Sequence, residues 1–277
     1  KVIDMSQMTN LPKSFRSWLS SNYSFDLPRL CAFKHSRDGT KKWSVGLENG
    51  NYVEMVLIPE RDRNTLCVSS QVGCALRCDF CSTGKQGFKA NLNTAEIVGQ
   101  LVLANRHLSL EGKKVSNIVF MGMGEPLLNF EAVSSAINLF QDDCAFGLSK
   151  RKVTLSTAGL VPGIMRMKET LDCSLAISLH APTDLVRNVL VPINRKFPIK
   201  DLLAAASEYI ESRQSLRKLI VEYTLIKGVN DSSQDAALLA DLLKPIKCKI
   251  NLIPFNTFDG SNYKAPKDVY IKAFQRR

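Results

Sequence analysis

The chain has 277 residues, of which 45% are hydrophobic and 23% are charged. This length suffices for one large globular domain, and the composition is ordinary for a soluble protein. The 37 basic residues exceed the 26 acidic ones by 11, which favours a polyanion such as nucleic acid over an acidic partner, although a basic surface without any such partner fits equally well. Because no apolar run approaches the roughly 18 residues of a membrane span and no signal peptide is present, we expect a cytoplasmic protein without membrane contact.

The first 60 residues predict a small accessory segment. Phe15 and Trp18 mark a short amphipathic helix, and residues 42–47 and 52–57 predict two strands of a hairpin that leads into the main domain. We therefore divide the chain into an N-terminal accessory segment, 1–60, which is the end of a larger domain, and a core, 61–277.

In the core, short apolar runs alternate with longer segments of helical period. Each run predicts a strand, and the runs lie near residues 66–69, 117–121, 152–155, 174–179, 219–225 and 249–253. Strands that alternate with helices imply βα units, right-handed crossovers and a parallel sheet. Six such units form either an open doubly wound sheet or a partial barrel, and periodicity alone does not separate these two folds.

Capping residues predict where two of the core helices begin. Asn93 with Glu96 forms a capping box for a helix that runs to about Leu110. Asp231 with Gln234 opens a second helix, whose apolar face carries Leu238, Leu239, Leu242 and Leu243.

Three of the eight cysteines, Cys74, Cys78 and Cys81, form a C-x3-C-x2-C motif directly after the first core strand. Thiolates this close can each bind one corner of a [4Fe–4S] cluster, which leaves the fourth iron open to an outside ligand. A zinc site would usually need a second pair of ligands, and a redox pair of Cys78 and Cys81 would leave Cys74 without a role. We favour the cluster and keep zinc and redox thiols as alternatives.

This motif is the signature of the radical S-adenosylmethionine (SAM) superfamily, and longer stretches resemble one family within it. They resemble RlmN, the dual-specificity 23S rRNA and tRNA adenine-C2 methyltransferases, over about residues 40–277, at 65–74, 120–127, 153–157, 177–182, 191–194 and 250–256. The sister family Cfr, which methylates C8, resembles the chain less, because the Pro after Gly124-Glu125 is typical of RlmN. The resemblance implies a TIM-like partial (β/α)6 barrel of the radical SAM type.

The resemblance also implies a set of cofactor contacts at strand ends. Gly122 and Gly124 flank one strand end, where missing side chains let a ligand approach the backbone. Gly124 and Glu125 resemble the site for the methionine ammonium of SAM, although the pair alone would read as a tight turn with an exposed Glu. Five further positions match family contacts with SAM, Leu179 through its backbone: Ser156, Ser178, Leu179, His180 and Asn256.

Two residues before the motif match family residues that act on the substrate. Cys67 resembles the cysteine that resolves a protein–RNA adduct, and Glu54 resembles the proton acceptor. From the residues alone, Cys67 would be a small buried strand residue, and Glu54 a side chain that alternation points to water. The remaining thiols are most simply structural: Cys31, Cys144, Cys173 and Cys248.

The resemblance implies a cycle that consumes two SAM molecules. The first methylates a cysteine near the C-terminus, and the 5′-deoxyadenosyl radical from the second takes a hydrogen from that methyl group. The resulting carbon radical adds to the electron-poor C2 of adenine, after which Glu54 helps to remove a proton and Cys67 forms a disulfide with the enzyme sulfur. No cysteine follows Cys248, so we expect the methyl carrier beyond Arg277, and we expect further residues at both ends of the chain.

RNA contacts are less specifically indicated. Arg77, Lys85 and Lys89 surround the cysteine motif and could neutralise phosphates, although such groups are also typical of a solvated face. No standard RNA-binding module is present, and the target base would have to be flipped out of its stack. The resemblance implies 23S rRNA and tRNA as substrates, an electron donor such as flavodoxin, and a monomer. A C8 methyltransferase, a glycyl-radical activase and a zinc-containing RNA-binding module remain the alternatives.

Overall fold

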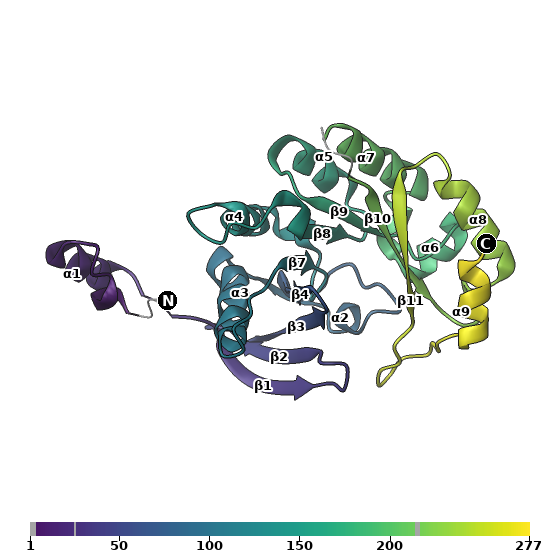
Figure 1. Cartoon of the computed structure of the whole chain (residues 1–277). Coiled ribbons are helices and arrows are strands. Elements are labelled where there is room, and N and C mark those ends of the chain that lie inside the picture. The colour runs from purple at the N-terminus through teal and green to yellow at the C-terminus, as the bar shows by residue number, and fades with distance from the viewer. Residues whose placement is uncertain (1–3, 25, 214–216) are drawn as a thin grey trace.

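The computed structural model describes residues 4–24, 26–213 and 217–277, and the described part is organised around one curved nine-stranded sheet (Figure 1). In spatial order the strands are β1 (Arg29–His35), β2 (Lys41–Gly46), β3 (Tyr52–Glu60), β4 (Arg63–Cys67), β7 (Asn117–Phe120), β8 (Val153–Thr157), β9 (Ser174–Ser178), β10 (Leu219–Leu225) and β11 (Cys248–Pro254). Neighbouring strands from β4 to β11 are parallel, whereas β1 to β4 are joined antiparallel. The six predicted core strands and their parallel order are confirmed.

Helices cover the convex side of the parallel strands, as the ribbon in Figure 1 shows. Most of them connect consecutive strands: α3 (Thr94–Ser109), α4 (Phe130–Gln141), α5 (Val161–Thr170), α6 (Asp184–Leu190), α7 (Ile199–Glu211), α8 (Ser233–Leu243) and, after the last strand, α9 (Asp268–Gln275). Three short 3-10 helices lie in the described connections, η2 (Pro126–Asn129), η3 (Lys150–Lys152) and η4 (Pro192–Arg195), and a further one, η1 (Met5–Gln7), precedes α1. This arrangement is the predicted partial (β/α)6 barrel, and periodicity alone could not distinguish it from an open sheet.

The sheet sends its apolar side chains toward the helices. Register places Phe120 beside Leu155 and Leu155 beside Leu175, and all three side chains are buried. The ring of Phe120 packs on Phe140 of α4, with 6.2 Å between the ring centroids. Since side chains alternate along a strand, the residues between these point into the concave side of the barrel.

The predicted hairpin is confirmed as β2 and β3, and it continues the main sheet. Val56 on β3 pairs with Cys67 on β4, and the strand β1, which the sequence did not predict, extends the sheet beyond β2. The division at residue 60 falls in the tight turn between β3 and β4, where Arg63 forms an ion pair with Glu60. The boundary between accessory segment and core therefore stays a prediction, while the sheet runs across it.

The predicted N-terminal helix is α1 (Lys13–Asn22), which has no buried residue. Phe15 and Trp18 stack on each other at 5.7 Å and are both about half exposed. The helix is amphipathic as expected, but among the described residues its apolar side packs on no core.

One capping box is confirmed and the other was predicted one residue too early. The side chains of Asn93 and Glu96 bond each other's backbone N–H as predicted. The helix α8 is capped by Ser232 with Asp235, because the carboxylate of Asp231 accepts instead from the N–H of Gly228 in the preceding loop. The predicted apolar face is correspondingly corrected: Leu239 and Leu243 are buried, Leu242 is partly buried, and Leu238 is exposed.

Among the described helices, none combines the length and apolar character that a bilayer crossing requires.

Candidate functional site

The C-x3-C-x2-C motif lies in a loop that leaves the sheet and returns to it. The loop follows β5 (Gln71–Gly73), contains the short helix α2 (Ser82–Lys85) and ends at β6 (Phe88–Asn91), which pairs with β5. Left-handed backbone at Gly73 lets its peptide approach Gly87, since a Cβ there would lie 1.7 Å from the Gly87 carbonyl oxygen. The hairpin stem β5–β6 thereby holds both ends of the cysteine loop.

Within this loop the three thiols lie within range of each other's charge. Burial, with smaller contributions from negative charge on Glu125 and Cys81, raises the pKa of Cys74 to about 11. Burial also raises the pKa of Cys78, with the other two motif charges acting in the same direction. Binding to the iron ions of a cluster would reverse the preference of these thiols for the protonated form, because metal coordination deprotonates a thiol. In the described ranges no three or more Cys, His, Asp or Glu side chains are grouped to hold a single metal ion.

Glu125 is a buried carboxylate beside the thiols. Its Oε2 accepts from the N–H of Ala158 at 2.8 Å and its Oε1 from the N–H of Leu127 at 3.1 Å. Burial raises the pKa of Glu125 to about 7, although these hydrogen bonds act in the opposite direction. Among the described residues no ion pair to Glu125 is formed, so a cationic ligand would compensate its charge.

The backbone next to Glu125 is shaped by Gly124, which has φ of 99°. A Cβ at this position would lie 2.5 Å from the Cβ of Gln71, so only glycine fits against β5. The amide oxygen of Gln71 in turn accepts from the N–H of Glu125 at 2.8 Å. The Gly-Glu pair is therefore a packed strand-end turn with a buried Glu, and the expectation of an exposed Glu in the turn interpretation is wrong.

Ser156 and Ser178 lie on the concave face at the ends of β8 and β9. Register pairs Ser156 with Ala176, two residues before Ser178, so the two serines share one face. The following residue, Leu179, is completely buried; its N–H donates to the carbonyl of Glu222 at 3.0 Å and its carbonyl accepts from Arg187. The backbone of Leu179 is therefore fixed from both sides.

His180 is held in one orientation and one charge state. Its backbone is left-handed with φ of 58°, and its Nδ1 accepts from the N–H of Thr224 at 3.0 Å. Burial, together with the charge of Arg187, lowers the pKa of His180 to about 3, so the ring is neutral and carries its proton on Nε2. The ring meets Phe80 of the cysteine loop edge to face, 4.7 Å between centroids.

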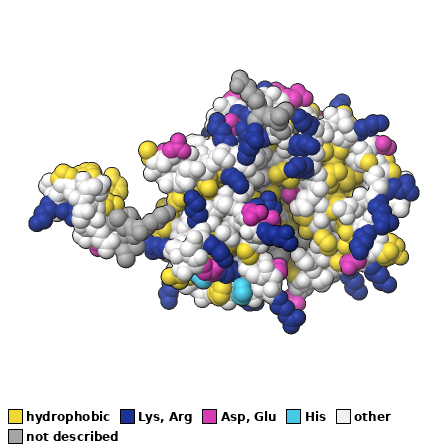
Figure 2. All heavy atoms as spheres, in the orientation of Figure 1, with side chains coloured by type: hydrophobic (Ala, Val, Ile, Leu, Met, Phe, Trp, Pro, Cys, Tyr) yellow, Lys and Arg dark blue, Asp and Glu magenta, His cyan; other side chains and the backbone are white. Residues whose placement is uncertain are grey.

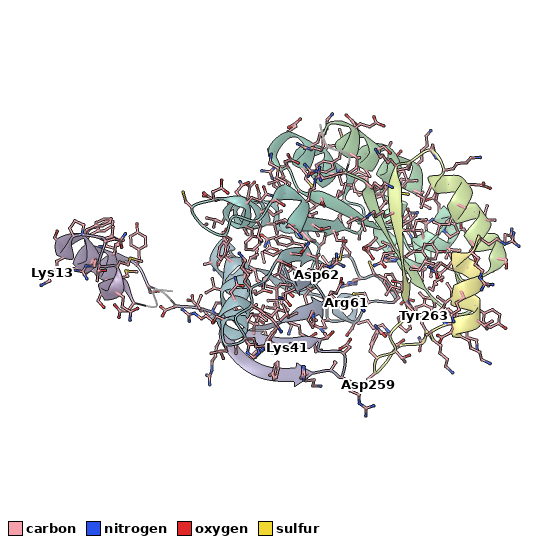
Figure 3. The ribbon with its side chains drawn as sticks, in the orientation of Figure 1. Lys13, Lys41, Arg61, Asp62, Asp259 and Tyr263 are labelled. Atoms are coloured by element: carbon pink, nitrogen blue, oxygen red, sulfur yellow. The ribbon has the colours of Figure 1, made fainter. Side chains whose placement is uncertain are left out.

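The segment after β11 closes against the cysteine loop. Tyr263, labelled in Figure 3, donates its hydroxyl to Asp79, and Lys85 donates to the carbonyl of Gly260 at 2.6 Å. Asn256 is exposed at the start of this segment, directly after the buried Phe255, which belongs to the apolar group that contacts the cysteine loop. All matched SAM positions thus lie at the carboxyl ends of strands around the loop.

Glu54 and Cys67 share the concave face farther along the sheet. Cys67 pairs with Val56, and Glu54 stands two residues before Val56 on the same side of β3. Burial raises the pKa of Cys67 to about 12. The side chain of Glu54 is 52% exposed and bonds Lys42 at 2.8 Å, in agreement with the expectation that alternation points it to water.

Sequence reasoning missed Arg187, the largest side chain that is fully buried in the described structure. It lies on α6 in a segment of ordinary helical pattern, where an arginine would be expected at the surface. The nearby Val191-Pro-Ile-Asn194 stretch, which was matched to the family, was the one available signal, because Asn194 bonds the guanidinium.

Comparison with known proteins agrees with this geometry. The radical SAM superfamily profile matches residues 68–240. The chain is 51% identical over 272 residues to the dual-specificity RNA methyltransferase RlmN of Vesicomyosocius okutanii, covering 98% of this chain and 76% of that protein. It is likewise 51% identical to the RlmN of Marinobacter nauticus, over 99% and 75% of the two chains. A radical SAM methyltransferase from Sphaerobacter thermophilus superposes with a TM-score of 0.93 at 39% identity, over 99% and 81% of the two chains.

Proposed function

This chain belongs to the RlmN family of dual-specificity RNA methyltransferases, within the radical SAM superfamily, and we propose that it methylates C2 of an adenine in 23S rRNA and in tRNA. The observation that carries this proposal is the agreement of about half of all residues with RlmN proteins over nearly the whole chain. The chain spans about three quarters of the length of these relatives.

The family uses a [4Fe–4S] cluster and SAM, and the residues of this chain fit both. Three neighbouring thiols in one loop suit an iron–sulfur cluster, and a buried carboxylate without a basic partner suits the ammonium group of SAM. When bound, the two groups supply the electron, the radical and the methyl group.

We assign the residue roles from this fit. Cys74, Cys78 and Cys81 hold the cluster, while Gly124 and Glu125 receive the ammonium of SAM. The other cofactor contacts come from the strand ends around the loop: Ser156, Ser178, Leu179, His180 and Asn256. Because His180 is neutral and its Nδ1 is engaged, only its Nε2–H is free to donate.

Glu54 and Cys67 are proposed to act on the RNA. Both lie on the concave face of the sheet, so a base that enters the barrel can meet both side chains. A thiol whose pKa is about 12 stays protonated at neutral pH, and Cys67 must therefore lose its proton as it forms the disulfide. Glu54 is the proposed proton acceptor, and its exposed position keeps it in exchange with water.

RNA would reach the barrel over a basic surface. Figure 2 shows Lys and Arg side chains distributed over the visible face with acidic side chains between them, which suits contacts to phosphates spread along a folded RNA. We further propose that the protein acts as a monomer in the cytoplasm and receives its electron from a small donor protein such as flavodoxin.

The test is anaerobic reconstitution followed by three measurements on the full-length gene product. We expect iron and sulfide in a one-to-one ratio, 5′-deoxyadenosine on reduction with SAM, and 2-methyladenosine in digested rRNA and tRNA by mass spectrometry. Methylation at C8 would contradict the proposed regiochemistry. Zinc without sulfide, or a glycyl radical with unmodified RNA, would reject the proposed function altogether.

A further inference from the structure

Arg187 is a buried cation with an unusual set of partners. It is 0% exposed, and within the described residues no carboxylate approaches it at ion-pair distance. Its guanidinium donates instead to main-chain carbonyls: Nε to Leu179 at 2.9 Å, and Nη2 to Ser178 at 2.9 Å and Ala158 at 2.6 Å. The carboxylate of Asp184 attracts the guanidinium but is joined to it through Asn194 and forms no direct ion pair with it. Burying a guanidinium without a direct ion pair is unfavourable, so this arrangement needs a compensating role.

The surroundings are built to hold this side chain. Nη1 donates to Asn194 at 2.7 Å, and the amide of Asn194 donates to Asp184 and to Asn188, at 2.7 and 2.8 Å. Gly159 makes room for the guanidinium, because a Cβ there would lie 3.3 Å from Nη2. The rotamer of Arg187 is thus fixed by α6, by η4 and by the loop after β8.

The hydrogen bonds of Arg187 join two strand ends that line the proposed SAM site. Ser178 and Leu179 end β9, and Ala158 follows β8. The N–H of Ala158 donates to Oε2 of Glu125 while its carbonyl accepts from Arg187. One guanidinium therefore bonds the same residue whose N–H orients the carboxylate assigned to the SAM ammonium.

The same side chain also faces the cysteine loop. The helix α6 that carries it ends at Leu190, whose carbonyl accepts from the N–H of Asp79 at 3.0 Å. Leu190 packs in an apolar group with Cys78, and a thiolate at Cys78 would be attracted by the charge of Arg187. Because the guanidinium of Arg187 is itself fully buried, its positive charge is screened less by water than a surface charge would be.

We propose that Arg187 is a positioning residue that fixes the β8 and β9 ends for SAM and places a permanent positive charge beside the cluster. The inference rests on the proposed function, since it concerns the same cofactors. The guanidinium shapes the site through the carbonyls of Ala158, Ser178 and Leu179, and its charge favours the reduced, more negative cluster over the oxidised one. The buried cation thereby gains in the loaded enzyme a second negative neighbour besides Asp184.

The experiment compares Arg187→Lys and Arg187→Met with the wild-type enzyme after anaerobic reconstitution. Lysine keeps the charge but cannot bond three carbonyls in a plane, so we expect SAM to bind at least about tenfold more weakly. Because the charge is kept, the equilibrium constant for reduction of the cluster should change by less than about threefold. Methionine removes the charge as well, so we expect the reduction equilibrium to fall by about tenfold, which is a shift of about 59 mV to lower potential. The readouts are calorimetric SAM binding and a redox titration followed by electron paramagnetic resonance.

Arg106→Met on the exposed end of α3 is the control and should change neither readout. If Arg187→Lys binds SAM within about threefold of wild type, the positioning role is overturned; if Arg187→Met keeps the wild-type potential, the charge role is overturned. Should Arg187→Met fail to fold, the lysine variant alone decides the positioning role, and Arg187→Gln replaces methionine for the potential. If the wild-type protein itself holds no cluster or binds no SAM, the proposed function fails first, and that result is recognisable before any variant is compared.

Discussion

The two faces of the curved sheet are built from different kinds of residue. The convex face under the helices is mostly apolar from β4 to β10, with Leu66, Ile118, Phe120, Leu155, Leu175, Ile177, Val221 and Tyr223. The concave face carries thiol, hydroxyl, amide and carboxyl groups at the positions between, with Cys67, Thr154, Ser156, Ser178, Glu222, Thr224 and Asn251. Closed barrels fill this space with branched apolar side chains, so a polar concave face indicates that a ligand fills it here.

This difference predicts that the convex face stabilises the fold and that the concave face binds the cofactors, which mutations can test. Changes on the convex face should lower the free energy of unfolding and leave the bound cofactors alone. Changes on the concave face and in the loop at its end should alter cofactor binding and leave the fold intact.

The largest effect is expected in the cysteine loop. Cys78→Ala removes one of three protein ligands from the proposed cluster, and we expect iron content to fall to background and methylation to drop by more than about a thousandfold. The circular-dichroism melt should remain cooperative, because the convex core is unchanged. Cys144→Ala, an exposed thiol, is the matched control; a Cys78→Ala protein with a full cluster would contradict the ligand assignment.

The convex face should give the largest loss of stability. Phe120→Ala leaves a cavity against Phe140, and we expect the free energy of unfolding to fall by about 3–5 kcal/mol in urea titrations. The affinity for SAM of the folded variant should stay within about twofold of wild type. Ser156 follows Leu155, the register neighbour of Phe120, and faces the concave side. Ser156→Ala should have the reverse effect: the free energy of unfolding should fall by less than about 1 kcal/mol, and SAM should bind several-fold more weakly. If the two variants weakened SAM binding equally, the assignment of stability to the convex face and of cofactor binding to the concave face would be wrong.

The convex half of this architecture could be predicted from the sequence. Six apolar runs gave the parallel strands, because strands buried on one side by helices are marked by Val, Ile, Leu and Phe. The barrel closure could not be predicted in the same way, since curvature depends on how strands twist and pack and leaves no periodic signal. The cap of α8 was misplaced because Asp231 and Ser232 are both good capping residues, and only the loop bond to Gly228 decides between them.

The concave half was predicted mostly through family resemblance. The spacing of the three cysteines predicts an iron–sulfur cluster site. Ser156, Ser178 and Asn256, in contrast, are common residue types whose positions in the sequence predict no function. The burial of Glu125 and Arg187 could not be read from the sequence, because charged residues are expected at the surface and both are buried by loops from distant strands.

The buried carboxylate should make the protein without its cofactors sensitive to pH. Glu125 has a pKa of about 7 in the folded chain against about 4.5 when unfolded, so the folded state binds more protons between these values. The contribution of this group is therefore fully present below pH 4.5 and is lost as the pH rises to about 7, a decrease of about 3 kcal/mol in the free energy of unfolding.

Glu125→Gln should flatten this part of the pH profile in urea titrations of the cofactor-free protein. In the reconstituted enzyme the same variant should bind SAM about tenfold more weakly, because a neutral amide cannot compensate an ammonium. Glu131→Gln, on the exposed start of α4, is the control for both measurements. A pH slope that survives in Glu125→Gln would assign the titration to another group.

The smallest effect concerns how the helices are anchored over the convex face. Ser232→Ala removes the hydroxyl that accepts from the N–H of Asp235 at the start of α8, and we expect a loss of about 1 kcal/mol in urea unfolding. Asp231→Ala removes only a loop bond to Gly228, so its effect should be smaller, in contrast to the sequence-based assignment of Asp231 as the cap. Neither variant should change SAM binding, since α8 covers the convex side; a larger loss in Asp231→Ala than in Ser232→Ala would restore the original assignment.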